Sequence, residues 1–92
     1  MSLVRCDSIT DGLRDSECLV AIVDYHRRTH YIRVERDFLT EIGGQKYLPM
    51  GIVQFHQATK TALVEFPHEP ESGINRIWVN QSQLASAIEA IA

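Results

Sequence analysis

The stretch from residue 48 to residue 84 constrains the fold most, because β-forming residues fill it and turn residues divide it. Three short segments there have strand-like composition: Leu48–Phe55, Thr61–Phe66 and Asn75–Val79. A further hairpin is predicted over Cys18–Glu35, where apolar and polar residues alternate. Together these segments predict a mainly β protein of about five strands, arranged as a small barrel or a strongly bent antiparallel sheet.

Length and composition indicate one ordinary globular domain. The 92 residues are 45% hydrophobic and 23% charged. The longest apolar run, Cys18–Val23, is far shorter than the roughly 20 residues that cross a bilayer as a helix, so no membrane span is expected. The first residues lack the apolar core of a secretory signal. Cys6 and Cys18 are expected to be reduced thiols, with a bridge between them as the alternative, and we therefore expect a cytoplasmic location.

The chain divides into three predicted parts. Residues 1–17 show no regular apolar period and are expected to form a loosely structured arm, with one helical turn near residues 8–13. Residues 18–84 form the β-barrel domain. A C-terminal helix is predicted over residues 82–92, and it packs on the barrel or on a second copy of the chain. Its apolar stripe consists of Leu84, Ile88 and Ile91.

Within the first hairpin, a two-residue turn at Arg27 and Arg28 would place Val23 opposite Ile32. A four-residue loop is the alternative, because two arginines are not the residues that a tight primed turn prefers. The two-residue turn would collect on one face Leu19, Ala21, Val23, Ile32 and Val34.

The order of the predicted elements, ending in the segment RIWVNQSQL, resembles that of SH3-like small barrels. In those folds a final strand with Trp and Val runs into a 3₁₀ turn that a leucine closes. The likeness covers residues 18–84 and rests on pattern. The chain lacks the acidic and aromatic first-loop signature of the members that bind proline-rich peptides. The resemblance therefore implies a fold and transfers no functional residue.

The strongest binding candidate is Trp78, the single tryptophan. If Ile77 and Val79 point into the core, Trp78 points outward, where an exposed tryptophan is a typical binding hot spot. The expected partner-binding residues lie around it and on the loop of residues 67–73: Trp78, Arg76, Phe66, His68 and Glu69. The alternative is that the C-terminal helix covers Trp78, either from the same chain or from a second copy in a homodimer.

A second candidate is the basic tip of the first hairpin. Arginines there suit anions, because guanidinium groups make paired hydrogen bonds to phosphate and carboxylate. The residues of this tip are His26, Arg27, Arg28 and His30. The alternative is a solvated loop whose arginines pair with neighbouring carboxylates: Asp24, Glu35 and Asp37. Because the net charge is −3, nucleic acid is not the expected partner of the whole chain.

No catalytic, nucleotide-binding or metal-binding motif is present in the sequence. His26 and His30 flank a turn and are expected to point to opposite sides, so we expect no metal site and no cofactor. Cys18 begins an apolar strand and is expected to be a small buried hydrophobe. The sequence therefore predicts a non-enzymatic interaction or accessory module that binds a protein partner or itself. The alternative is anion or nucleic-acid binding through Arg27 and Arg28.

Overall fold

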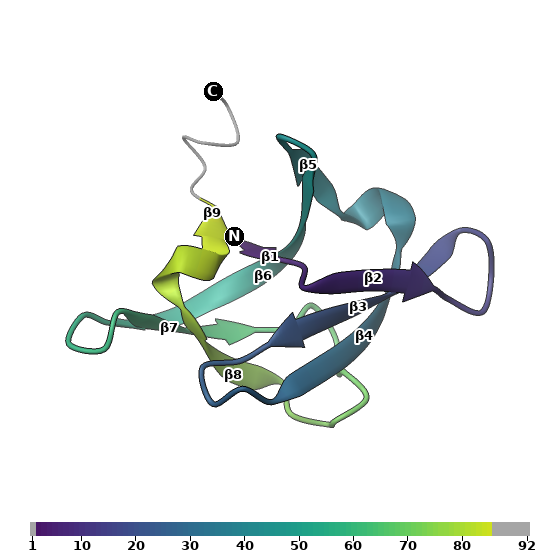
Figure 1. Cartoon of the computed structure of the whole chain (residues 1–92). Helices are drawn as coiled ribbons and strands as arrows, with labels where there is room; N and C mark the ends of the chain where they lie inside the picture. The colour runs from purple at the N-terminus through teal and green to yellow at the C-terminus, as the bar shows by residue number, and fades with distance from the viewer. Residues whose placement is uncertain (1, 86–92) are drawn as a thin grey trace.

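The computed structural model describes residues 2–85, which fold into two antiparallel sheets without an α-helix in that range (Figure 1). The six-stranded sheet has the order β8 (Arg76–Asn80), β7 (Thr61–Glu65), β6 (Gln45–His56), β1 (Ser2–Arg5) and β9 (Leu84–Ala85), and β5 (Thr40–Ile42) also pairs with β6. The three-stranded sheet has the order β2 (Ser8–Asp11), β3 (Glu17–Val23) and β4 (Thr29–Glu35). Two 3₁₀ turns, η1 (Arg36–Phe38) and η2 (Gln81–Gln83), connect strands. None of the helical turns in this range has the length and apolar character that a membrane crossing requires.

Side chains from both sheets meet in a single core. The side chains of a strand point alternately to its two faces, so one face can be buried while the other is exposed. Strand β4 shows this most clearly, since its sequence THYIRVE alternates exposed and buried positions. The largest fully buried side chains come from β1, β3, β4, β6, β7 and β8: Val4, Cys18, Val20, Ile22, Ile32, Leu48, Met50, Val64 and Val79. The prediction of a mainly β fold is confirmed.

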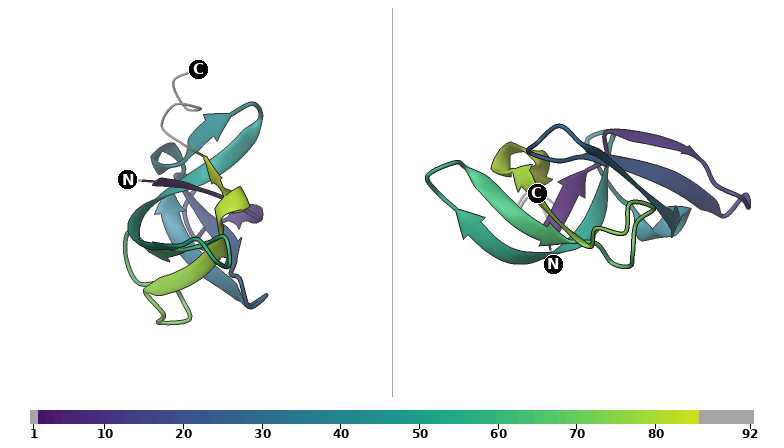
Figure 2. Two further views of the ribbon diagram at one scale, coloured as in Figure 1. Left: turned by 90° about the vertical axis from the view of Figure 1, so that its left-hand side faces the viewer. Right: turned by 90° about the horizontal axis from the view of Figure 1, so that it is seen from below.

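The two sheets do not close into a barrel, so that part of the prediction is wrong. A closed barrel requires the first and last strands of one sheet to pair with each other. Among the described residues, the edge strands of the larger sheet are β8 and β9, and they do not pair with each other, since β9 pairs only with β1. In the smaller sheet, the outer edge of β4 is hydrogen-bonded to a loop instead of a strand. In the right-hand view of Figure 2, the β6–β7 hairpin extends to one side and the β2–β3–β4 sheet extends to the other.

The predicted register of the β3–β4 hairpin is also wrong. Val23 lies opposite Thr29, three residues before the predicted Ile32. Because the shift is odd, it exchanges the two faces of the strand, and Val20 and Ile22 now point into the core. The cause is a five-residue loop, Asp24–Arg28, in place of a two-residue or four-residue turn.

Two backbone hydrogen bonds close this loop. The N–H of Asp24 donates to the carbonyl of Arg28 at 2.8 Å, and the N–H of Arg27 donates to the carbonyl of Asp24 at 3.0 Å. Arg27 has a φ of 65°, in the left-handed region that a non-glycine residue rarely adopts. The loop is thus tightly defined although it contains no glycine.

The N-terminal segment is ordered, contrary to the expected loose arm. Residues 2–5 form β1, which pairs with β6 and β9, and residues 8–11 form β2 where a helical turn was expected. Val4 is fully buried between Leu48 on one side and Leu84 on the other. Strand β1 therefore contributes to the core of the fold.

The predicted C-terminal helix is wrong at its start. Residues 81–83 form the 3₁₀ turn η2, and Leu84 and Ala85 continue as strand β9. The N–H of Asn80 donates to Gln83 Oε1 at 2.9 Å, and Gln83 Nε2 donates to the carbonyl of Val23 at 2.9 Å. These bonds turn the chain toward β1. The rest of the predicted helix, residues 86–92, lies outside the described residues.

Candidate functional site

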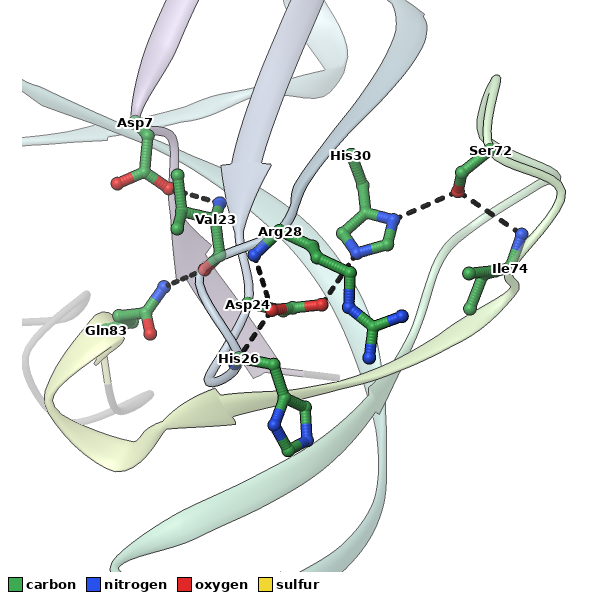
Figure 3. A network of polar contacts seen from close by, with 9 residues as sticks. All are labelled: Asp7, Val23, Asp24, His26, Arg28, His30, Ser72, Ile74 and Gln83. Atoms are coloured by element: carbon green, nitrogen blue, oxygen red, sulfur yellow. Dashed lines mark hydrogen bonds and ion pairs between the residues drawn. The ribbon is translucent and has the colours of Figure 1, made fainter.

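A chain of polar side chains fixes the β3–β4 loop from the inside (Figure 3). Asp24 Oδ1 accepts the backbone N–H groups of His26 at 2.8 Å and Arg28 at 2.9 Å. Asp24 Oδ2 lies 2.8 Å from His30 Nε2, and His30 Nδ1 lies 3.0 Å from Ser72 Oγ. Only 7% of Asp24 and 2% of His30 is exposed, so the two side chains form a buried pair. We call Asp24, His30 and Ser72 the polar staple.

The electrostatics of the polar staple favour an ionised Asp24. Burial opposes ionisation of this carboxyl, but the hydrogen bonds from His30 and from the N–H groups of Arg28 and His26 outweigh that effect. The pKa of Asp24 is therefore lowered from its usual value. A carboxylate that accepts three hydrogen bonds stabilises the loop conformation that provides them.

The order carboxylate, imidazole and hydroxyl is also that of a nucleophilic triad, so the surroundings of Ser72 are decisive. An acyl-transfer site requires backbone N–H donors free to bind the developing oxyanion. The two backbone N–H groups after Ser72 are both occupied: Gly73 donates to the carbonyl of Pro70 at 3.0 Å, and Ile74 donates to Ser72 Oγ at 3.3 Å. The polar staple thus has the features of a structural link between the loop and β4.

The loop of residues 67–73 covers the outer edge of β4. The N–H of Glu71 donates to the carbonyl of Tyr31 at 2.8 Å, and His68 Nε2 donates to the carbonyl of Arg33 at 2.7 Å. Pro70 is the buried residue of this loop. A strand edge covered in this way is protected from pairing with another chain.

An aromatic cleft lies between the β3–β4 loop and the β6–β7 hairpin. Its volume is about 300 Å³, and it is lined by Tyr25, His26, Gln54, His56, Thr59, Thr61 and Trp78. The rings of His56 and Trp78 meet edge to face with centroids 6.2 Å apart. The N–H of Tyr25 donates to the carbonyl of Trp78 at 2.6 Å, and this bond fixes the loop to β8. Tyr25 remains 42% exposed beside a half-buried Trp78.

A smaller basic hollow of about 160 Å³ adjoins the aromatic cleft and shares His26 and Trp78 with it. Arg28 and Arg76 supply its positive charge, and Asp24 and His30 of the polar staple also line it. Arg76 Nε lies 3.2 Å from a Glu65 carboxylate oxygen, whereas no ion pair in residues 2–85 includes Arg28. We call the aromatic cleft and the basic hollow together the Trp78 surface.

A larger polar cleft of about 570 Å³ lies on the other side of the β3–β4 loop. Arg5 of β1 and Arg27 of the loop line it, together with Asp7 and Ser82. Asp7 Oδ2 accepts the N–H of Val23 at 2.7 Å (Figure 3). Among the described residues, neither arginine takes part in an ion pair.

The structure brings together only part of each predicted site. Trp78 and Arg76 are neighbours on the Trp78 surface, whereas Phe66 is 5% exposed and belongs to the core. His68 lines a separate cleft of about 460 Å³ beside Phe38, and Glu69 is exposed on the loop of residues 67–73.

The basic tip is divided among different environments. His26 and Arg28 line the basic hollow, Arg27 lines the polar cleft, and His30 lies at the basic hollow but is buried in the polar staple. His30 therefore cannot serve as an exposed anion ligand in this conformation. The expectation that Asp24 neutralises the arginines is also wrong, because its carboxylate binds backbone N–H groups and His30.

Tyr25 and His56 belong to the Trp78 surface but were not among the predicted residues. A signal for His56 exists in the sequence, since His56 and Trp78 lie on the same outward face once β6, β7 and β8 are aligned. Tyr25 had no such signal, because its position depends on the five-residue loop.

The two cysteines are free thiols and buried in the described structure. Burial, together with the neighbouring Cys18 and Asp7, raises the pKa of Cys6 to about 12. Burial also raises the pKa of Cys18. Because the thiolate is the reactive form, neither thiol has the character of a nucleophile.

Comparisons with protein-family models, with curated proteins and with solved structures find no match for this chain. The fold and the site define a small mainly β protein of two antiparallel sheets with an aromatic cleft beside a basic hollow. Its function has to be argued from the chemistry of these surfaces.

Proposed function

We propose that this chain is a non-enzymatic binding module whose Trp78 surface takes an acidic segment of a protein partner. The observation that carries the proposal is the adjacency of two unlike hollows that share Trp78. One is lined by aromatic rings, and the other carries two arginines. Aromatic residues and arginine are the residue types that dominate binding energy at protein interfaces.

The two hollows define the chemistry of the segment. The aromatic cleft suits an apolar or aromatic side chain, because Tyr25, His56 and Trp78 present ring faces and edges there. The basic hollow suits a carboxylate, because the guanidinium group of Arg28 has no ion-pair partner in residues 2–85. The expected ligand therefore has an apolar side chain close to Asp or Glu.

Two basic residues near the Trp78 surface have an unusual backbone conformation. Arg27 and Lys60 are the non-glycine residues with positive φ among the described residues, at 65° and 56°. They lie in the two loops that border the aromatic cleft. A left-handed conformation costs a non-glycine residue about 1–2 kcal/mol. Neither side chain lines the two hollows of the Trp78 surface, and Arg27 lines the polar cleft instead.

The first test is a selection of random peptides displayed on phage against the immobilised full chain. Enriched peptides should combine Asp or Glu with a nearby Leu, Phe or Trp, and they should change the fluorescence of Trp78, the only tryptophan. Arg28→Gln should weaken their binding at least about tenfold, as expected for a desolvated charge pair. Arg33→Gln on β4 is the matched control, and its affinity should stay unchanged.

Two results would refute this function. One is a selection that enriches no acidic peptides. The other is equal affinity of the selected peptides for Arg28→Gln and for the unmodified chain. Thermal unfolding of both variants, followed by circular dichroism, establishes that they are folded.

The SH3-like resemblance and the cytoplasmic location belong to the same proposal. Support for the resemblance comes from β8, which contains Trp78 and runs into the η2 turn followed by Leu84. The open sheets count against it. Support for the location comes from the two free thiols.

We propose anion binding in the polar cleft as a second candidate function. Arg5 and Arg27 favour it, because both line one cleft and neither arginine has an ion-pair partner in the described chain. Inorganic phosphate and a single-stranded oligonucleotide are the probes, titrated while amide chemical shifts are recorded. Binding should weaken steeply with salt. Binding that persists in Arg27→Gly, or that does not respond to salt, would exclude this site.

A further inference from the structure

The chain itself contains a segment that matches the ligand proposed for the Trp78 surface, an apolar side chain close to a carboxylate. The loop between β2 and β3 presents Leu13 at its tip, and this side chain is 81% exposed, the highest value among the exposed large hydrophobic residues in the described chain. Asp11 and Asp15 flank it. No ion pair in residues 2–85 includes Asp15. An apolar anchor next to a free carboxylate is the ligand expected under the proposed function.

This loop is held in shape at its base. Arg14 lies 3.3 Å from Glu17 and 3.5 Å from Glu35, and Arg36 Nε donates to the carbonyl of Asp15 at 3.0 Å. The N–H of Glu17 also donates to the carbonyl of Arg14 at 3.0 Å. A preorganised loop loses little conformational freedom when it binds. We call residues 11–16 the Leu13 loop.

The two ends of the β3–β4 hairpin carry opposite charge. The end near the Leu13 loop is acidic, and its carboxylates outnumber its two arginines, Arg14 and Arg36. These carboxylates are Asp11, Asp15, Glu17, Glu35 and Asp37. At the other end, Arg28 and Arg76 line the basic hollow and Arg27 lines the polar cleft, and Asp24 is the one carboxylate among residues 24–28. Complementary charge of this kind steers association and selects the orientation of the partners.

One molecule cannot make this contact with itself. The Leu13 loop and the β3–β4 loop lie at opposite ends of β3 in Figure 1. A seven-residue strand such as β3 is about 23 Å long at roughly 3.3 Å per residue. The contact therefore has to join two copies of the chain.

We propose that the Trp78 surface binds the Leu13 loop of a second copy, so that the chain associates head to tail. Leu13 of one copy enters the aromatic cleft of the next, and the Asp15 carboxylate meets Arg28 in the basic hollow. This inference rests on the proposed function. Because such a contact is heterologous, each dimer keeps one unused loop on one copy and one unused surface on the other, and assembly continues unless a ring closes.

Sedimentation velocity of the full chain over a range of concentrations tests the proposal. The average mass should rise with concentration and fall toward the monomer when salt is raised from about 50 to about 300 mM, since salt screens the opposed charges. Leu13→Ser and Arg28→Gln should each shift the midpoint concentration of assembly upward at least tenfold. Arg33→Gln, the matched control, should assemble like the unmodified chain.

A mixture of the two defective variants gives the sharpest result. Leu13→Ser retains an intact Trp78 surface, and Arg28→Gln retains an intact Leu13 loop. An equimolar mixture should therefore form a dimer with one functional contact, and no larger species. A mixture that stays monomeric, or an unmodified chain that stays monomeric at all concentrations, would overturn the self-association.

These outcomes are separable from failure of the proposed function. If acidic peptides bind the Trp78 surface while the chain stays monomeric, the second copy is excluded as the partner and the binding function stands. If peptides and the Leu13 loop both fail to bind, both proposals are refuted. Both substituted side chains are exposed, so circular dichroism melting curves close to that of the unmodified chain are expected.

Discussion

Removing the carboxylate of the polar staple should be among the most damaging single changes in this chain outside the apolar core. Asp24→Ala deprives two backbone N–H groups of their acceptor and leaves His30 Nε2 buried without its partner. An unsatisfied buried polar group costs about 1–3 kcal/mol, and loss of the hydrogen bonds to the loop N–H groups costs about 1 kcal/mol more. We therefore expect a loss of about 2–4 kcal/mol, a large share of the roughly 5–15 kcal/mol that stabilises a typical domain.

Urea unfolding followed by Trp78 fluorescence measures this loss. Ser72→Ala is the matched comparison, because it removes the other partner of His30 from an exposed position and should cost only about 0.5–1.5 kcal/mol. Since Asp24 and Ser72 both act through His30, the double variant should cost less than the sum of the two single variants. A loss below about 1 kcal/mol for Asp24→Ala, or strictly additive effects, would refute the reasoning.

The pH dependence follows from the same carboxylate. The folded state lowers the pKa of Asp24 below its usual 3.8. The stabilisation is therefore complete above the unfolded pKa and is lost as the pH falls through the folded pKa. Asp24→Asn should remove this acid-induced loss of stability. The measurement is the urea midpoint of the unmodified chain and of Asp24→Asn, taken from neutral to strongly acidic pH. An equal loss of stability in both proteins would contradict the assignment.

Three further changes test other features of the structure. Arg27→Gly relieves a left-handed φ of 65° and should raise the free energy of unfolding by roughly 0.5–1 kcal/mol; a loss of stability in urea unfolding would show that the Arg27 side chain supports the loop. Gly12→Ala should destabilise the chain, because its Cβ would lie 2.7 Å from Glu17 Cβ and 3.0 Å from the Glu17 carbonyl carbon, and an unchanged thermal midpoint would contradict this packing. The buried thiol of Cys6, whose pKa is raised to about 12, should react with a disulfide reagent only after unfolding in urea, and rapid reaction of the folded chain would refute its burial.

The sequence predicts strands correctly where apolar and polar residues alternate regularly. It predicts the strand register wrongly where a side-chain hydrogen bond determines the length of the connecting loop. Outward-facing Trp78 between buried Ile77 and Val79 follows from alternation alone, and the burial of these two neighbours confirms it. The register of β3 and β4 does not follow, because the loop length depends on Asp24 accepting the N–H groups of His26 and Arg28. No period in the sequence reveals that interaction.

Long-range pairing explains the remaining differences. Strand β1 is only four residues long, so its apolar pattern is too short to recognise, and its partners Leu48 and Leu84 lie far away in the sequence. The polar staple is hidden for the same reason, since Ser72 reaches His30 only after the loop of residues 67–73 covers the edge of β4. The sequence thus identified Trp78 and its neighbour Arg76 as candidates, but it did not show that Tyr25 and His56 complete the surface around them.

The polar staple and the Trp78 surface share residues of the β3–β4 loop, and this links stability to binding. Within residues 24–28, Asp24 points inward to hold the loop, while Tyr25, His26 and Arg28 line the two hollows. A surface held in its bound shape loses less freedom on binding than a mobile one. Ser72 lines neither hollow but contacts His30, so Ser72→Ala should weaken the binding of the selected peptides several-fold, mainly through faster dissociation. Unchanged dissociation in surface plasmon resonance would show that the loop keeps its shape without the link to Ser72.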